Sequence, residues 1–343
     1  MALPVALTFS LLAGLAALAG YLVLEPELEA EHRLWMLSHF AVDYQSFGFV
    51  KRGLVGSLVD VPADPAAVGR VAALSLAMLL AALGASVAFV RQTGAPLALA
   101  VAFAVSPGTF QNFAFDVGRF DQIGAVLCLL SILALRRGIP GVAPVAVFLG
   151  VLIHEAFALL FLPLIVAVAS AEARGRVAPW LAPALAGGAA TAAVLLFGGA
   201  EPEAIADFFA KLGPFYYPLR IWVSPLGESV AYASGHLLHA DTLRWSILPS
   251  AGFLAVNAVV LGRMIARAAP GSLWLMIPAL APVALVLVGI DIPRWSALAV
   301  FNLFTVALLV VRDTSRLPWL LAALAPLGPL GIAWAFPGWL PAQ

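Results

Sequence analysis

The residues of this chain that are able to do chemistry fall into five short clusters, each beside a long hydrophobic segment. The clusters are Asp43-Tyr44 with Lys51-Arg52, Asp116 with Arg119 and Asp121, His154-Glu155, His236 with His239 and Asp241, and Asp291 with Arg294. Ionisable groups in apolar surroundings are costly and usually mark functional sites. Each of the five clusters is therefore a candidate functional site.

The first cluster combines a carboxylate with an adjacent basic pair. Asp43 precedes Lys51 by eight residues, and Tyr44 follows Asp43 directly. A carboxylate in this setting suits a general base that accepts a proton from a hydroxyl. Arg52 is able to hold a phosphate through a bidentate fork and Lys51 as a point charge, with Tyr44 beside them. The alternative is an ion pair that only orders a loop.

The second and third clusters are candidates for the same polar cavity. Asp116 and Asp121 flank Arg119, and Asp121 also suits a cap at a helix N-terminus. We interpret His154-Glu155 as a wall of the substrate site, the alternative being a buried pair that locks helices together. It is not a metalloprotease motif, because Ala158 stands where the second histidine would be.

The last two clusters give weaker signals. His236, His239 and Asp241 are spaced for a divalent metal, although a solvated helix face is the simpler interpretation of two histidines. Arg294 suits a lipid phosphate, unless it only pairs with Asp291. The sequence has no phosphate-binding glycine loop and no dinucleotide fingerprint, so we expect no cofactor beyond that possible metal.

Composition sets the environment of these clusters. Hydrophobic residues make up 63% of the 343 residues and charged residues only 10%, against about 25% charged in soluble domains. Such a chain has too little polar surface for a soluble fold and is predicted to be a polytopic membrane protein. The net charge of zero argues against a nucleic-acid partner. The single cysteine, Cys128, excludes an internal disulfide.

Eleven apolar segments approach the length of about 20 residues that a helix needs to cross a bilayer. They are residues 3–24, 67–90, 95–110, 121–136, 139–154, 156–171, 179–199, 246–263, 271–290, 295–311 and 317–336. We predict an all-α polytopic membrane protein with one domain, 1–343, and about 11 transmembrane helices. Two long outer loops, about 26–66 and 200–245, are expected to carry short interfacial helices.

Arginines indicate the orientation, because they occupy every second short linker. They are Arg91, Arg136-Arg137, Arg174 with Arg176, Arg263 with Arg267, and Arg312 with Arg316. The positive-inside rule assigns these linkers and the N-terminus to the cytoplasm, and all five clusters to the outer face of a plasma or bacterial inner membrane. One long helix across 137–172 is the alternative to a hairpin there, and it would invert everything downstream.

The layout resembles the GT-C superfamily of integral-membrane glycosyltransferases. Similar to those enzymes are an acid in the first outer loop, Asp43, and a span opened by Asp121. A basic turn at Arg136-Arg137 follows, and then a hairpin whose polar pair, His154-Glu155, precedes Leu162-Pro163. Pro293-Arg294-Trp295 also looks similar. The hairpin position is often lysine in such families, so the histidine and glutamate put phosphate binding there in doubt.

The resemblance implies a transferase that takes a sugar from a polyprenyl-phosphate donor and gives it to a glycan, lipid or protein hydroxyl outside the cytoplasm. Asp43 would be the base, Asp116 or Asp121 would position the acceptor or a metal, and the phosphate would lie on Lys51, Arg52, Arg119 or Arg294. Three alternatives remain from the sequence. One is a polysaccharide polymerase or ligase acting on undecaprenyl-diphosphate-linked glycan, the second is a lipid or solute transporter, and the third is a structural membrane subunit with no chemistry.

Overall fold

The computed structural model describes residues 39–59, 65–173, 175–206, 226–237, 246–289, 291–312 and 317–327. Within these ranges the regular elements are helices, and no strand occurs. The predicted span at 3–24, most of the loop at 200–245 and the end of the last predicted span lie outside the described residues.

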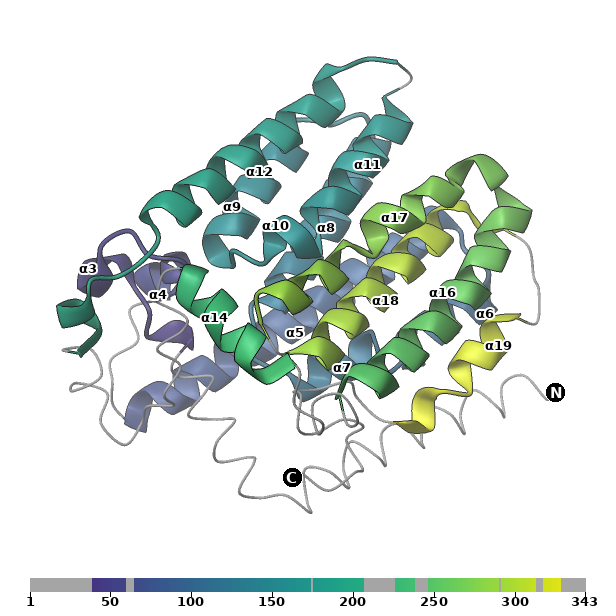
Figure 1. The fold of residues 1–343 in the computed structure, drawn as a ribbon. Coiled ribbons are helices and arrows are strands. Elements are labelled where there is room, and N and C mark those ends of the chain that lie inside the picture. The colour runs from purple at the N-terminus through teal and green to yellow at the C-terminus, as the bar shows by residue number, and fades with distance from the viewer. Residues whose placement is uncertain are drawn as a thin grey trace.

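The helices follow one another in a bundle whose two halves are visible in Figure 1, with α9 to α12 on one side and α16 to α19 on the other. Their bounds are α3 (Tyr44–Phe47), α4 (Gly53–Val59), α5 (Pro65–Thr93), α6 (Leu97–Val105), α7 (Phe110–Phe115), α8 (Asp121–Arg136), α9 (Val142–Ile153), α10 (Phe157–Leu160), α11 (Leu162–Glu172), α12 (Ala178–Phe197), α14 (Leu226–Leu237), α16 (Leu248–Ala268), η4 (Pro270–Leu275), α17 (Met276–Ala279), η5 (Ala281–Leu287), α18 (Ile292–Val310), α19 (Leu317–Ala322) and η6 (Ala325–Leu327).

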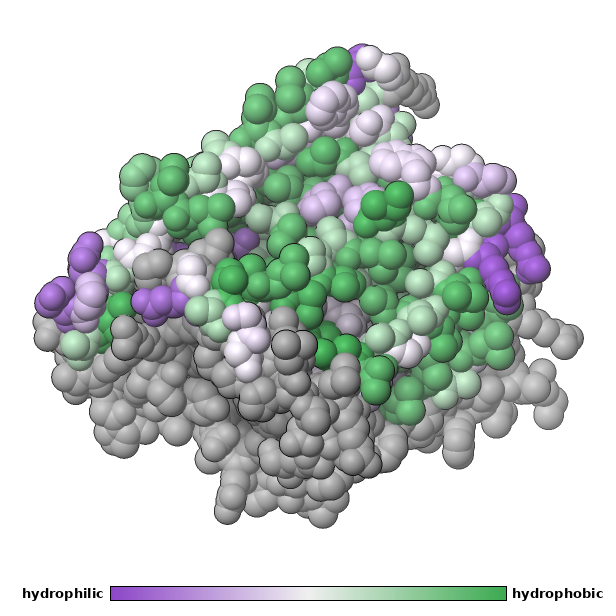
Figure 2. Space-filling model, in the orientation of Figure 1, coloured by the Kyte–Doolittle hydropathy of each residue, from purple (hydrophilic) through white to green (hydrophobic). Residues whose placement is uncertain are grey.

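Six helical stretches among the described residues are long and apolar enough to cross a membrane. They are Gly69–Thr93, Leu97–Phe115, Ala178–Phe197, Leu248–Ala268, Pro270–Leu287 and Ile292–Val310. All six coincide with predicted spans, and α9 and α11 are shorter apolar helices at two others. Hydrophobic residues cover most of the described part of the face in Figure 2, with hydrophilic ones toward its edges. The chain is a helical membrane protein, while the count of eleven spans stays a prediction.

The segment between residues 137 and 172 is a hairpin and not one long helix. The helix α9 ends at Ile153, and His154 has an extended backbone. The start of α8 lies near this break, because Asp121 Oδ1 is 3.5 Å from His154 Nε2. The end of α8 lies near the end of α11, where Arg136 Nε is 3.9 Å from Glu172 Oε1. From Arg137 the chain therefore runs toward the His154 end of the bundle and then returns to the Arg136 end at Glu172.

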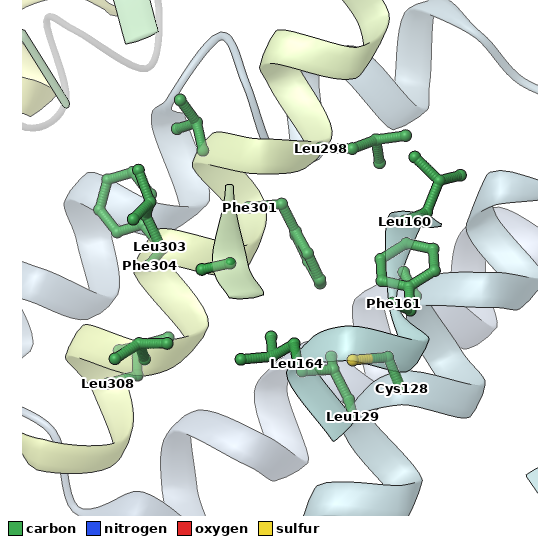
Figure 3. Packing of buried hydrophobic residues seen from close by; sticks show 14 of the residues in the cluster. Cys128, Leu129, Leu160, Phe161, Leu164, Leu298, Phe301, Leu303, Phe304 and Leu308 are labelled. Atoms are coloured by element: carbon green, nitrogen blue, oxygen red, sulfur yellow. The ribbon is translucent and has the colours of Figure 1, made fainter. Parts of the chain in front are cut away.

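The helix α18 is the central element of the fold. Almost all of its residues are buried, including Phe301 and Phe304, which are fully so. Figure 3 shows its apolar side chains facing those of α8, α10 and α11, and Phe301 packs edge-on against Phe161 with ring centroids 6.2 Å apart. Because α18 begins at Ile292, this packing fixes the position of Asp291 and Arg294 at one end of the bundle.

Asn302 links α18 to two interrupted helices. Its Nδ2 donates to the carbonyl of Leu160 at 2.7 Å and lies 3.4 Å from the carbonyl of Ala279. Those carbonyls belong to the last residues of α10 and α17, where backbone carbonyls have no N–H partner within the helix. Asn302→Leu leaves buried acceptors without their donor, and we expect it to lower the free energy of unfolding by about 1–3 kcal/mol.

A matched control for Asn302 lies one turn further along α18. Thr305 is equally buried, but its hydroxyl donates only to Phe301 of its own helix. Thr305→Val should therefore cost less than Asn302→Leu in thermal unfolding in detergent. Equal losses for the two variants would contradict the linking role of Asn302.

Candidate functional site

Eight ionisable residues from four separate segments form one continuous series of charge contacts at the His154 end of the bundle, here called the charge network. Each successive pair of its members lies within ion-pair distance. In order the members are Arg52, Glu155, His154, Asp121, Arg294, Asp291, Arg119 and Asp116. All eight belong to clusters that the sequence singled out, so four of the five predicted clusters do meet in space.

Arg119 is the most deeply buried arginine of the charge network. Its side chain is 3% exposed, with Nη1 2.6 Å from Asp291 Oδ2 and Nε 3.0 Å from Asp116 Oδ1. The turn that brings Asp116 and Arg119 together contains Gly118, whose φ of 93° suits glycine. Gln122 anchors this turn to α8 by donating to the carbonyls of Phe113 and Asp116.

Two helix starts present acids to the charge network and do not use them as caps. Asp121 is the first residue of α8 and Asp291 precedes α18, yet neither helix start has a side-chain cap hydrogen bond. Asp121 is 3% exposed, and its two oxygens face His154 Nε2 at 3.5 Å and Arg294 Nε at 3.4 Å. The capping alternative for Asp121 is therefore not what the structure shows. The helix N-termini still favour both negative charges.

Glu155 joins the first-loop arginine to the rest of the charge network. Two nitrogens of Arg52 donate hydrogen bonds to this carboxylate: Nη2 lies 2.5 Å from Oε1 and Nε lies 2.9 Å from Oε2. On the other side, His154 Nδ1 lies 3.3 Å from Glu155 Oε2. Burial acts to raise the pKa of Glu155, but Arg52 and His154 together hold it well below its usual value, so the carboxylate is ionised.

The backbone at Arg52 is in an unusual conformation. Its φ is 67°, the only positive φ of a non-glycine residue in the described part of the chain. A β-carbon makes this conformation costly, by about 1–3 kcal/mol, and such strain is concentrated at ligand-binding and catalytic sites. The next turn is packed tightly, because a β-carbon at Gly53 would lie 2.5 Å from the Tyr44 ring. The sequence Lys51-Arg52-Gly53 thus turns sharply into α4.

Lys51 lies beside the charge network without joining it. Its side chain is 7% exposed, and its ammonium makes no hydrogen bond or ion pair with the described residues. Its backbone N–H donates to Gly198 at 3.0 Å, just beyond α12. Burial lowers the pKa of Lys51 to about 8, against the attraction of Glu155. A buried ammonium that makes no ion pair with the described residues would be stabilised by a further anion.

Asp43 and Tyr44, the other predicted residues of the first loop, have local roles in the structure. Asp43 is the N-cap of α3, accepting from the backbone N–H of Ser46 at 2.5 Å and from its hydroxyl at 3.0 Å. It forms no hydrogen bond or ion pair with the charge network among the described residues. The Tyr44 ring stacks on Phe49, and its buried hydroxyl has no hydrogen-bond partner there.

The predicted histidine cluster is not described by the structure. His239, Asp241 and the side chain of His236 lie outside the described residues. Within them, no three His, Cys, Asp or Glu residues are arranged to hold a metal ion. The possible metal at His236 therefore stays a prediction.

Sequence reasoning underestimated Asp291. It was considered only as a neighbour of Arg294, but one oxygen, Oδ2, contacts both Arg119 and Arg294, at 2.6 and 3.2 Å. Burial raises the pKa of Asp291 to about 6, and Arg119 opposes that rise. The available signal was its position before Pro293, at the start of a long apolar segment.

Comparison with known proteins found no matching family model, no matching curated protein and no matching solved structure.

Proposed function

We propose that this chain is a membrane glycosyltransferase that moves a sugar from a polyprenyl-phosphate donor to an acceptor hydroxyl on the extracytoplasmic face. The observation that carries the proposal is the charge network, in which four distant segments contribute buried acids and bases at one end of a membrane bundle. Buried ion pairs add little stability compared with apolar packing. A network of this extent is therefore better explained by binding and proton transfer.

The arginine-rich turns support the proposed orientation. Arg136 lies near Glu172 at the end of the bundle away from His154, and burial together with the charge of Arg136 lowers the pKa of Arg312. These residues are the ones that the positive-inside rule assigns to the cytoplasm. The charge network then faces outward, where a donor without a nucleotide is the available source of activated sugar.

Asp121 is our candidate for the general base. It is buried, its two oxygens accept no hydrogen bond from the described residues, and His154 lies next to it. It would take the proton of the acceptor hydroxyl as the oxygen attacks the anomeric carbon and the polyprenyl phosphate leaves. Asp43 is already engaged as a helix cap. We therefore move the role of base from Asp43, where the sequence suggested it, to Asp121.

Lys51 is our candidate residue for binding the phosphate of the donor, and this assignment predicts that the affinity for the donor depends on pH. A phosphodiester stays ionised over the relevant range, whereas Lys51 loses its charge as the pH rises through about 8. Affinity for a dialkyl phosphate such as farnesyl methyl phosphate should fall about tenfold between about pH 7 and about pH 9. Lys51→Arg, which keeps its charge, should remove most of this dependence. A flat profile for the wild type would contradict the assignment.

The direct experiment is a transfer assay with the purified chain in liposomes. The expected result is loss of sugar from a short polyprenyl-phosphate donor, with release of polyprenyl phosphate and glycosylation of an added acceptor. Movement of the intact donor between leaflets without release of the phosphate would instead support a transporter. Turnover of diphosphate-linked glycan alone would support the polymerase.

A further inference from the structure

The contact between Arg52 and Glu155 has the geometry in which an arginine holds an oxyanion. Two guanidinium nitrogens meet the two carboxylate oxygens, Nη2 at 2.5 Å and Nε at 2.9 Å. Arginine binds phosphate oxygens with this same fork. The side chains of Arg52 and Glu155 are 13% and 21% exposed, so the contact lies at the accessible edge of the charge network.

A second cation, Lys51, immediately precedes Arg52 in the sequence. Its side chain is buried and makes no ion pair with the described residues. Among the charges that act on Lys51, Glu155 is the strongest, ahead of Arg52 and Glu228. Glu155 therefore acts on both cations, on Arg52 through the bidentate contact and on Lys51 through its negative charge.

We propose that the Glu155 carboxylate is an internal stand-in for a phosphate group. It occupies an anion-binding seat formed by Arg52 and Lys51, and an arriving phosphate group displaces it from this seat. This role rests on the proposed function, because its ligand is the phosphate of the lipid-linked donor. A phosphate has more oxygens than a carboxylate, so it is able to engage the Arg52 fork and the Lys51 ammonium together.

The structure also provides a place for the displaced carboxylate. His154 Nδ1 is already 3.3 Å from Glu155 Oε2, and His154 lies between Glu155 and Asp121. When Glu155 leaves Arg52, His154 is a second partner for its carboxylate. The strained backbone of Arg52, with φ 67°, fits a residue held ready for a ligand. Arrival of the donor would thereby change the surroundings of the proposed base.

The test measures binding of farnesyl phosphate to the full chain in a phosphate-free maltoside detergent, by calorimetry. With a competing internal ligand, the apparent association constant equals the intrinsic constant multiplied by the fraction of time that the seat is open. Glu155→Gln removes the competitor's charge, so we expect binding about tenfold tighter than in the wild type. Glu172→Gln, the same change at the opposite end of the bundle, should leave binding unchanged. In an Arg52→Gln background, Glu155→Gln should give no gain.

Each outcome separates the stand-in from the proposed function. If the wild type binds farnesyl phosphate and Glu155→Gln binds it equally or more weakly, the stand-in role is refuted while the donor chemistry stands. If neither protein prefers farnesyl phosphate over farnesol, the proposed donor itself is wrong. An equal gain for inorganic phosphate alone would support the seat but overturn the lipid as its occupant. Should Glu155→Gln fail to fold, Glu155→Asp, which weakens the fork, should bind about threefold tighter than the wild type, and an unchanged affinity would refute the stand-in.

Discussion

Replacing Arg119 with methionine is expected to lower the free energy of unfolding by about 3–5 kcal/mol. Arg119 is 3% exposed and contacts two acids from different parts of the chain, Asp291 at 2.6 Å and Asp116 at 3.0 Å. Methionine fills much of the same space but removes the cation that contacts both carboxylates, and leaves Asp291 only its longer contact with Arg294. Thermal unfolding of the purified chain in detergent, followed by tryptophan fluorescence, measures the loss.

Two variants test whether the loss of stability is specific to Arg119. Arg136→Met makes the same change at the opposite end, where the contact with Glu172 is 3.9 Å and partly exposed, so it should cost less than about 1 kcal/mol. The double variant Arg119→Met with Asp291→Asn also removes one of the two negative charges that Arg119 contacts, and it should recover part of the stability. A loss for Arg119→Met no larger than for Arg136→Met would contradict the role given to Arg119.

Replacing Asp121 with asparagine is expected to reduce the rate of sugar transfer by about 10²–10⁴-fold. Asparagine has nearly the same shape, but its amide does not accept the proton of the acceptor hydroxyl. The neighbouring His154 and Arg294 remain, and the apolar packing of α8 is unchanged. The rate is measured with a saturating lipid-linked donor, alongside the midpoint of thermal unfolding.

Asp43→Asn is the matched test for the acid that the sequence favoured. Asparagine caps helices about as well as aspartate, so the cap on α3 should persist and transfer should stay within about threefold of the wild type. If Asp43→Asn abolishes transfer while Asp121→Asn retains it, the base belongs to the first loop, and the assignment made from the charge network is wrong.

The arrangement of the helices was largely predictable because hydrophobic length and arginine position are strong signals. The helix starts at Asp121 and near Asp291, the hairpin apex at His154 and the basic end at Arg136 all follow from them. Convergence of the polar clusters was also predictable, since acids and bases at the same ends of neighbouring helices must meet or remain unpaired in apolar surroundings.

The partners within the charge network were not predictable from local sequence. Asp43 precedes α3 and Asp121 begins α8, but only tertiary packing makes Asp43 a cap and turns Asp121 toward His154. Similarly, adjacent Lys51 and Arg52 look equivalent in sequence. The positive φ of Arg52 directs one side chain to Glu155, while Lys51 stays buried and without an ion pair among the described residues. Such differences depend on contacts across about a hundred residues.

The most direct measurement is an experimental structure of the chain with a phosphonate analogue of a polyprenyl-phosphate sugar. We predict that the phosphonate lies within hydrogen-bond distance, about 3 Å, of Lys51 and Arg52, with Glu155 turned to His154 and the sugar beside Asp121. Density for the phosphonate at the opposite end of the bundle, near Arg136 and Arg312, or density on the lipid-facing surface alone, would contradict the account.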